Sequence, residues 1–429
     1  MARILLLTLV FRPDNVSTAQ IMADLAKDLK DRGHSLFVLT TTPHYNDDPE
    51  AKSRQPLRYR WGFLLQESTF EGIPVVHVWM PRKGPNKLVR MLAWLGFHAV
   101  STGYGLLSRF KPDVIVAPSP PLTIGVSAWI LGLRHRAPFI YNVQEIYPDV
   151  AVHLGALGHP FLIRRMQQLE QFVYRKAAAL TTISAGMRQR LLNKGVPPDK
   201  VHLIPNFVDV TEFEPSPKDN TFSRAQAFHD KFLVSYAGNM GKPQGLETLV
   251  HTAQLLRAEP DIHFLLMGDG SERESLGRLA ASLRLSNLTL LPHQPYALMG
   301  KAYAAADLSF VSQVPGTSSD GIPSKVYRIM ACARPVLACT DPGSDLARIL
   351  SDAGAGMVVP PGDSHKLAEV IRGASRDRNT WRQMGLKGRA HVVTFYGRAS
   401  VSDRYHELIS SLCCWREEAL VRRATHGAV

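Results

Sequence analysis

The sequence predicts an α/β protein with two doubly wound, Rossmann-like domains and a cleft between them. Short apolar runs alternate with helical patterns along the whole chain, which is typical of parallel sheets covered by helices on both faces. This alternation stops at a turn-rich stretch, residues 205–217, and then starts again. A length of 429 residues also favours two domains over one.

The N-terminal domain is assigned to residues 1–205. One helix is expected at Thr18–Arg32, because Gly33 follows it in the position where helices commonly end. The expected strands are Arg3–Leu9, Ser35–Thr40, Pro74–Trp79, Val114–Ala117, Phe139–Val143, Leu180–Ile183 and Val201–Ile204.

The C-terminal domain is assigned to residues 206–398, and residues 399–429 to a helix that packs back toward the first domain, followed by a charged tail. The helical pattern covers Ser400–Leu412, and the tail is expected to be loose from Trp415 onward. The expected strands of this second set are Phe232–Tyr236, His263–Met267, Leu288–Leu291, Leu308–Val311, Val336–Ala338 and Met357–Val359.

Composition narrows the class of protein. The four cysteines show no metal-ligand spacing, which favours a reducing compartment without a disulfide framework. No Asp-x-Asp triplet or His/Cys cluster predicts a catalytic metal. No apolar run is long enough to predict a spanning helix, and the apolar N-terminus is too short for a signal peptide.

Positive charge is concentrated in the first half of the chain. Residues 1–205 hold 25 Lys and Arg against 14 Asp and Glu, a net charge of +11, whereas residues 206–429 hold 25 against 23, a net charge of +2. The basic half points to an acidic partner: anionic lipid, a phosphorylated acceptor or nucleic acid. Nucleic acid is disfavoured, because no known nucleic-acid-binding module is present.

Residues 82–111 combine a basic collar with an aromatic-rich helix. The cations are Arg82, Lys83, Lys87 and Arg90, and the apolar residues that follow include Trp94, Phe97 and Tyr104. This pattern suits an anionic membrane surface. It equally suits an ordinary helix that covers the N-terminal sheet.

A glycine-rich turn, Gly238–Gly245, joins an apolar strand to a helix expected to start near Gln244. Glycines let backbone N–H groups approach an anion, and a helix N-terminus favours negative charge. Lys325, in Asp320-Gly-Ile-Pro-Ser-Lys325, lies at another loop-to-helix junction and could reach the same anion. These two loops predict a diphosphate-bearing ligand, and therefore an enzyme that acts on a nucleotide-activated group.

Several motifs together resemble glycosyltransferase family 4, the retaining enzymes with two Rossmann-like domains (the GT-B fold). The closest resemblance is to the exopolysaccharide and O-antigen branch, with its colanic acid and N-acetyl-L-fucosamine transferases. The motifs cover nearly the whole chain: Phe11-Arg-Pro-Asp14, Gly33-His34, Asn142-Val-Gln-Glu-Ile-Tyr-Pro-Asp149, Ile183-Ser184, Ile204-Pro-Asn-Phe-Val-Asp209, Gly238 to Glu247, Met267-Gly-Asp-Gly270, and Pro323-Ser-Lys325 leading into Met330 to Pro335.

The resemblance implies transfer of a sugar from a nucleoside-diphosphate sugar with retention of the anomeric configuration. The donor is expected on the C-terminal domain, as a co-substrate with no further cofactor and no metal. The acceptor is expected on the basic N-terminal domain. In this branch it is commonly a polyprenyl-diphosphate-linked sugar, which implies a cytoplasmic protein at the inner face of the plasma membrane.

On this resemblance the donor is expected to contact a set of loop residues. Lys242 and Lys325 are assigned to the diphosphate, with a solvated loop lysine as the alternative for each. The glycines of Met267–Gly270 are assigned to the base or ribose, with a plain turn capped by Asp269 or Ser271 as the alternative. The donor-binding residues are Gly238, Asn239, Gly241, Lys242, Gln244, Gly268, Asp269, Gly270, His293, Thr317, Ser318, Ser319, Pro323 and Ser324.

The expected catalytic residues are Glu145, Asp320 and Lys325. Members of the family usually have Glu-x7-Glu where this chain has Asp320 and Arg328, so the ribose contact of the second glutamate is in doubt. Arg328 could instead face solvent. Glu145 is expected to orient the acceptor hydroxyl or to act as base, unless it is a carboxylate at a helix N-terminus. Asp149 is a weaker candidate.

Four further residues have structural expectations. Ser17 or Thr18 is expected to cap the first helix, and Ser324 the helix that begins after it. His34 is expected to end a helix.

Two other functions remain open. The first is a nucleotide-sugar epimerase of the same fold, which needs no acceptor. The second is a catalytically degenerate partner subunit that binds nucleotide-sugar or lipid, which the Asp320 and Arg328 pair motivates.

Overall fold

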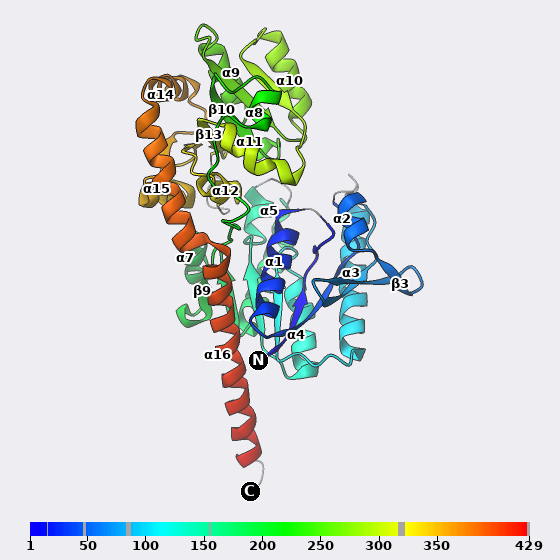
Figure 1. Cartoon of the computed structure of the whole chain (residues 1–429). Coiled ribbons are helices and arrows are strands. Elements are labelled where there is room, and N and C mark those ends of the chain that lie inside the picture. Colours follow the sequence, from blue (N-terminus) through cyan, green and yellow to red (C-terminus); the bar gives the residue numbers. More distant parts are fainter. Residues whose placement is uncertain are drawn as a thin grey trace. The chain divides into compact units, whose positions relative to one another are not determined.

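The computed structural model describes residues 1–14, 16–45, 49–82, 87–153, 155, 157–315 and 322–426. Within these residues the chain divides into two compact units. The first holds residues 1–205 together with the residues from 401 onward, and the second holds Asn206–Ser400. We call them the N-domain and the C-domain. Each is an α/β domain built on a largely or wholly parallel sheet (Figure 1), which confirms the predicted fold class.

The N-domain sheet has, in the described part of the chain, the strand order β3-β4-β5-β2-β1-β6-β7-β8-β9. Its strands are β1 (Arg3–Leu7), β2 (Ser35–Thr41), β3 (Arg58–Trp61), β4 (Leu65–Phe70), β5 (Ile73–Val78), β6 (Val114–Pro118), β7 (Phe139–Val143), β8 (Ala179–Thr182) and β9 (Val201–Leu203). Its helices are α1 (Ser17–Asp31), α2 (Pro49–Arg54), α3 (Lys87–Leu107), α4 (Ile124–His135), α5 (Asp149–His153), α6 (Pro160–Lys176), α7 (Ala185–Asn193) and the C-terminal α16 (Arg398–His426).

The C-domain sheet has the order β12-β11-β10-β13-β14-β15 among the described residues, and all its pairs are parallel. Its strands are β10 (Phe232–Ala237), β11 (Ile262–Met267), β12 (Leu288–Leu291), β13 (Leu308–Ser312), β14 (Val336–Cys339) and β15 (Gly356–Val359). Its helices are α8 (Thr221–Ala225), α9 (Glu247–Leu255), α10 (Arg273–Ser282), α11 (Met299–Ala305), α12 (Lys325–Ala331), α13 (Asp345–Ala353), α14 (Ser364–Arg376) and α15 (Arg378–Tyr396).

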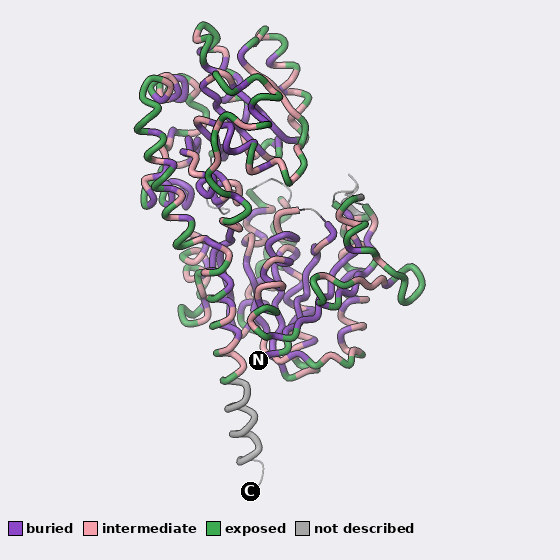
Figure 2. The backbone as a smooth tube through the Cα atoms, in the orientation of Figure 1, coloured by how far each residue is buried: buried purple, intermediate pink, exposed green. Residues whose placement is uncertain are grey.

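The central strands of each sheet are buried (Figure 2). In β10, for example, all six residues are buried. Continuous burial follows from helices on both faces, so such strands read as unbroken apolar runs. The sequence therefore identifies them within one or two residues at each end.

The β3–β4 hairpin was not predicted from the sequence. β4 pairs antiparallel with both β3 and β5, at an edge of an otherwise parallel sheet. All four residues of β3 are exposed, so the strand has no apolar run by which it could be recognised. The hairpin projects from the rest of the N-domain in Figure 1.

The C-terminal helix α16 is much longer than the predicted Ser400–Leu412, and it includes the residues from Trp415 that were expected to form a loose tail. The helical backbone continues to His426, because no glycine or proline interrupts residues 400–426. From residue 401 the helix belongs to the N-domain, where the Tyr405 hydroxyl accepts a hydrogen bond of 2.8 Å from Asn142.

The prediction that His34 ends the first helix is confirmed: after Gly33, which has a φ of +87°, the His34 amide donates a hydrogen bond of 3.1 Å to the Leu29 carbonyl of α1. The buried His34 ring accepts a 3.1 Å hydrogen bond from the Ala2 amide through Nδ1, and its Nε2 lies 2.8 Å from Nδ1 of His406 on α16. The side-chain cap expected from Ser17 or Thr18 is absent: α1 is preceded by Val16 and has no side-chain cap.

The turn-rich stretch at residues 205–217 is part of the C-domain from Asn206 onward. Phe213 is buried in the C-domain core, and the Arg389 guanidinium donates to the carbonyls of Val210 and Phe213. The segment therefore packs firmly against its own domain.

Candidate functional site

Backbone amides of the glycine-rich turn after β10 donate hydrogen bonds to other groups of the C-domain. The Gly238 amide donates to the Met267 carbonyl, the Met240 amide donates to the Asp269 carbonyl, and the Gly241 amide donates to the Gln244 side chain at 3.1 Å. These amides are therefore engaged within the protein. The expectation that the turn offers a row of amides to an anion is only partly met, and the side chains around the turn gain importance.

The turns after β10 and β11 are in direct contact. A Cβ atom on Gly268, where φ is +147°, would lie 1.8 Å from the Gly238 carbonyl oxygen. A Cβ on Gly270, where φ is +153°, would lie 2.5 Å from the Met240 carbonyl oxygen. Both positions thus require glycine, because the two turns could not approach each other with any larger residue.

Asp269 and Ser271 do not cap helix α10, which follows Glu272 and has no side-chain cap. The exposed Asp269 carboxylate instead accepts a hydrogen bond of 2.8 Å from the Gly270 amide. This bond stabilises the turn and leaves the rest of the carboxylate on the surface at the end of β11.

Lys325 lies against the glycine turn. It is the first residue of α12, and its ammonium lies 3.8 Å from the centroid of the Tyr236 ring and 2.8 Å from the position of a Cβ on Gly238. Loss of water around the ammonium lowers the pKa of Lys325 to about 7. A cation of low pKa beside a glycine turn is typical of a functional site.

The neighbours of Lys325 are placed less favourably for their expected roles. Ser324 precedes α12, but its hydroxyl does not cap the helix. Pro323 and Ser324 are half-buried. Lys242, which begins a short 3₁₀ turn to Gln244, has an exposed side chain. Of the two lysines that were assigned to a diphosphate, Lys242 is thus an exposed residue of the turn itself, and Lys325 is a desolvated residue beside Gly238.

Part of the expected donor site falls outside the described residues. Thr317, Ser318, Ser319 and Asp320 all lie in residues 316–321, which the structure does not describe. Their proposed roles stay predictions.

Arg328 does not face solvent. The guanidinium of this half-buried residue lies 5.3 Å from the centroid of the Phe213 ring and 5.6 Å from that of Tyr296. The Tyr296 hydroxyl in turn donates a hydrogen bond of 2.8 Å to Glu212. Arg328 therefore packs against aromatic rings, where its planar cation is stabilised.

His293 lies in the turn after β12. It is exposed, and its Nδ1 donates a hydrogen bond of 2.9 Å to the Gln294 carbonyl. The turns after β11 and β12 are also joined, since the Gly268 amide donates to the Leu291 carbonyl. The expected nucleoside-binding residues are thus brought to one edge of the C-domain sheet, at the carboxyl ends of β10, β11 and β12, where ligands bind in such sheets.

Glu145 follows β7 at the corresponding edge of the N-domain sheet. It lies in the loop before α5, so it is not a carboxylate at a helix N-terminus. Burial, together with the charge of Glu145 and a hydrogen bond to its carboxylate, raises the pKa of Tyr147 to about 12. The carboxylate is therefore held in place by a phenol that stays protonated at neutral pH.

Tyr45, Arg90 and Tyr147, which surround Glu145, were not identified as site residues from the sequence. Burial, and then the negative charges of Asp14 and Glu145, raise the pKa of Tyr45, while Arg90 opposes this shift. The positive charge of Arg90 likewise opposes the rise in the pKa of Tyr147. Tyr45, Arg90, Tyr147 and Glu145 thus form one cluster, which we call the strand-end cluster. Three of its members follow β2 or β7, and this position could have identified them.

Asp149 has a structural role. Its carboxylate accepts hydrogen bonds of 2.9 Å from both Arg190 and Lys194, and Lys194 also bonds the buried Glu170. Burial alone would raise the pKa of Asp149, but the bonds from Lys194 and Arg190 outweigh it and lower the pKa. Asp149 therefore ties α5 to α7 and is occupied by cations of its own domain.

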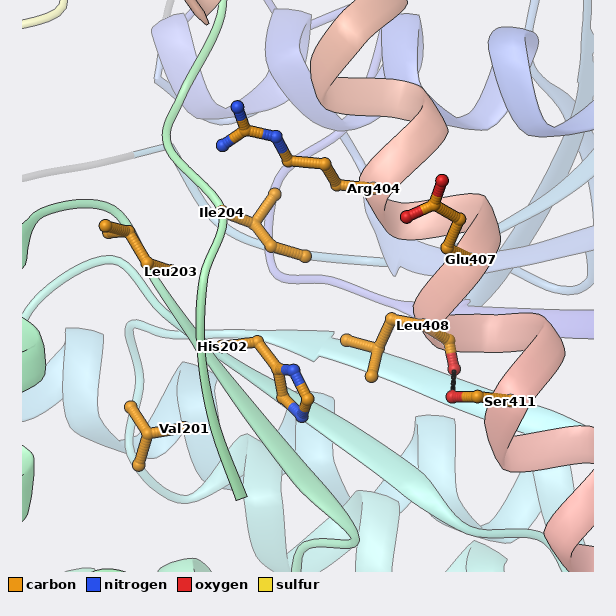
Figure 3. A pocket seen from close by; sticks show the side chains of 8 residues that line it. All are labelled: Val201, His202, Leu203, Ile204, Arg404, Glu407, Leu408 and Ser411. Atoms are coloured by element: carbon orange, nitrogen blue, oxygen red, sulfur yellow. Dashed lines mark hydrogen bonds between the residues drawn. The ribbon is translucent and has the colours of Figure 1, made fainter. Parts of the chain in front are cut away.

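A metal centre and a groove on the N-domain are the other places where a ligand could bind. Among the described residues, no group of three or more His, Cys, Asp or Glu side chains is placed to hold a metal ion. An open groove lies between β9 and α16 and is lined by residues such as His202, Arg404 and Glu407 (Figure 3). None of the predicted site residues lines this groove.

The chain matches two family models that together cover most of its length. Residues 18–206 match a glycosyl transferase 4-like domain, and residues 231–377 match glycosyl transferases group 1. Among curated proteins, a probable glycosyltransferase of Pseudomonas aeruginosa, WbjE, is 28% identical over 68% of this chain and 73% of its own length. WcaI of Escherichia coli, a putative colanic acid biosynthesis glycosyl transferase, is 24% identical over 87% of this chain and 92% of its own.

Solved structures share the fold. HepE of Anabaena, crystallised with UDP-glucose, has a TM-score of 0.72 at 17% identity, over 96% of this chain and 100% of its own. The glycosyltransferase WaaG has a TM-score of 0.64 at 14% identity, over 95% and 99%. These likenesses define the class as a two-domain α/β protein of the GT-B type. The family matches then identify the chain as a glycosyltransferase, which belongs with the family-4 enzymes.

Proposed function

We propose that the chain transfers a sugar from a nucleoside-diphosphate sugar to a lipid-linked saccharide in the synthesis of a cell-envelope polysaccharide, and that the anomeric configuration is retained. The use of a nucleoside-diphosphate donor is supported by the position of Lys325, a desolvated lysine beside the Gly238 turn. HepE, whose crystal structures contain UDP and UDP-glucose, supports a nucleotide-sugar donor. The E. coli relative, named for colanic acid biosynthesis, supports a polysaccharide product.

In the proposed reaction the bond between the sugar C1 and the β-phosphate oxygen breaks, and a bond from C1 to the acceptor oxygen forms. Negative charge develops on the departing phosphate. Lys325 and Lys242 stabilise this charge electrostatically, so the step needs no metal. Fixed cations contribute most where water is excluded, which favours Lys325 over the exposed Lys242.

The acceptor is assigned to the strand-end cluster of the N-domain. Glu145 orients the acceptor hydroxyl, whose proton passes either to this carboxylate or to the departing phosphate. Tyr147 is a positioning residue, because it holds the Glu145 carboxylate. Arg90 supplies the positive charge of the cluster, which would bind the diphosphate of a lipid-linked acceptor.

The test is a transfer assay with purified protein, UDP-, GDP- and dTDP-sugars, and membranes bearing polyprenyl-diphosphate-linked acceptors. We expect product with one donor class, in the presence of EDTA as well as in its absence. Lys325→Ala should lower kcat by about 100-fold or more, while Lys366→Ala on α14, a surface lysine paired with Glu369, should match the wild type. Binding of a nucleotide-sugar without turnover would favour the degenerate subunit, and sugar interconversion without acceptor would favour the epimerase.

A further inference from the structure

The outer face of α3 is apolar, although the helix lies on the surface of the N-domain. The inner side packs into the core, with Phe97 and Ser101 buried. On the outer side, Met91, Leu92 and Leu95 are 52%, 56% and 55% exposed. Surface helices of water-soluble domains usually present charged side chains outward. Residues 91–107 contain no Lys, Arg, Asp or Glu, so this helix has none there to present.

The exposed apolar residues form a continuous stripe. Met91, Leu92 and Leu95 are followed on the same side by Gly96 and Ala99, which are also exposed. Residues spaced by three and four positions lie along one side of a helix. Val89 and Leu107 extend the apolar surface at the two ends of α3, being 50% and 80% exposed. We call these seven residues the outer stripe of α3.

The segments that flank α3 in the sequence are strongly basic. Residues 51–111 contain ten Lys and Arg but only two Glu, a net charge of +8 out of +13 for the whole chain. Arg82 and Arg90 lie at the N-terminal end of α3, and Arg109 and Lys111 follow its C-terminal end. A second copy of the chain would bring like charges together at this surface. An anionic bilayer matches both the charge and the apolar stripe.

None of the helices in the described part of the chain is long and apolar enough to cross a membrane.

We propose that the outer stripe of α3 docks on an anionic membrane, with the helix lying along the boundary between headgroups and acyl chains. This inference deepens the proposed function and rests on it for the lipid-linked acceptor. The proposal gives α3 two roles, membrane docking and a contribution to the acceptor site. The second role follows because the charge of Arg90, on α3, interacts with the phenols of Tyr45 and Tyr147 in the strand-end cluster. One helix would then join the membrane surface to the acceptor site.

The test measures binding of the full chain to phosphatidylcholine vesicles with and without phosphatidylglycerol. We expect co-sedimentation with the anionic vesicles, weakened by high salt. The double variant Leu92→Glu/Leu95→Glu should lower the partition constant by about 100-fold or more, because two side chains lose burial and like charges meet. Leu133→Glu, at a residue 64% exposed on α4 of the same domain, should bind as the wild type does.

Binding of the double variant at the wild-type level would overturn the proposal. So would a wild-type dimer in light scattering that the double variant breaks, because the outer stripe would then be covered by a second copy. The denaturation midpoint of each variant shows that the fold is retained.

A transfer assay separates this inference from the proposed function. The double variant should retain transfer to an acceptor in detergent micelles and lose it with an acceptor in anionic vesicles. Equal transfer by the double variant and the wild type on vesicles would refute docking and leave the proposed function intact. Vesicle binding that depends on Leu92 and Leu95, without transfer from any donor, would refute the proposed function and leave docking intact.

Discussion

The ammonium of Lys325 lies 3.8 Å from the centroid of the Tyr236 ring. The Tyr236 hydroxyl donates a hydrogen bond of 2.5 Å to the Asn239 carbonyl within the glycine turn. The same tyrosine thus shapes the turn and supports the cation beside it. A ring face attracts a cation but does not neutralise it, so the lysine is kept near the turn and still available to an anion.

The first prediction concerns the pH dependence of donor binding. The free protein holds Lys325 with a pKa of about 7, and a bound diphosphate should raise this pKa. Binding then takes up a proton, and affinity for UDP should fall by up to about tenfold per pH unit as the pH rises above 7. Calorimetry in buffers of different ionisation enthalpy measures the proton uptake. Lys325→Arg should show none, and equal uptake by both proteins would contradict the assignment.

The second prediction concerns Gly268. An alanine Cβ there would meet the Gly238 carbonyl at 1.8 Å, and φ is +147°. Gly268→Ala should therefore lower the free energy of unfolding of the C-domain by about 3 kcal/mol and displace the glycine turn. Gly277→Ala on α10, where an added Cβ meets nothing within 4 Å, is the matched control and should stabilise by up to about 1 kcal/mol. Urea denaturation measures both, and similar values for the two variants would show that the turns move apart without cost.

The third prediction distinguishes two carboxylates of the N-domain. Glu145→Gln should lower kcat by about 100-fold or more and leave the denaturation midpoint nearly unchanged. Asp149→Asn should do the reverse, because it weakens the bonds to Arg190 and Lys194 and so destabilises the N-domain by about 1–3 kcal/mol. Both variants need kinetics and urea denaturation. A large loss of kcat in Asp149→Asn at full stability would return this residue to the active site.

The fourth prediction concerns acid stability. His77 is fully buried, where Nδ1 donates to the Thr41 carbonyl at 3.0 Å and Nε2 accepts from Ser68 at 2.8 Å. Burial lowers its pKa from 6.5 to about 4. Its contribution is thus present above about pH 6.5 and is lost toward pH 4, by about 1.4 kcal/mol per pH unit between these values.

Urea denaturation of the wild type and His77→Asn at pH 5 and pH 7 tests this. Asparagine can still donate to Thr41 but does not titrate, so the stability difference between the two pH values should shrink in the variant. An unchanged difference would assign the acid sensitivity to other histidines.

The sequence predicts best those elements whose residue pattern is set by burial alone. Strand β6 matches its predicted bounds to within one residue, because burial on both faces leaves an unbroken apolar run. The β3 strand has no buried face and therefore no such signal. Caps were predicted from residue type alone, and Ser324 shows why this fails: a serine before a helix caps it only when its side chain turns back toward the amides.

The sequence predicted which loops form the candidate site, but it did not predict the contacts that their residues make. Glycines and lysines at strand-to-helix junctions indicate where ligands approach, and Lys325 lies beside Gly238. The sequence could not show that the amides of this turn are engaged internally, nor that Arg328 packs against Phe213 and Tyr296. Both facts depend on partners far away in the chain, which spacing along one segment does not reveal.

The packing of α16 on the N-domain also affects the order in which the two domains can complete folding during synthesis. Tyr405 and Ile409 complete the interior of a domain whose first strand begins at Arg3. On the ribosome, the interior of the domain that is translated first therefore stays incomplete until the last segment emerges. The domain that is translated second has its whole sequence by residue 400, so it can reach its native state while the earlier one still lacks a helix.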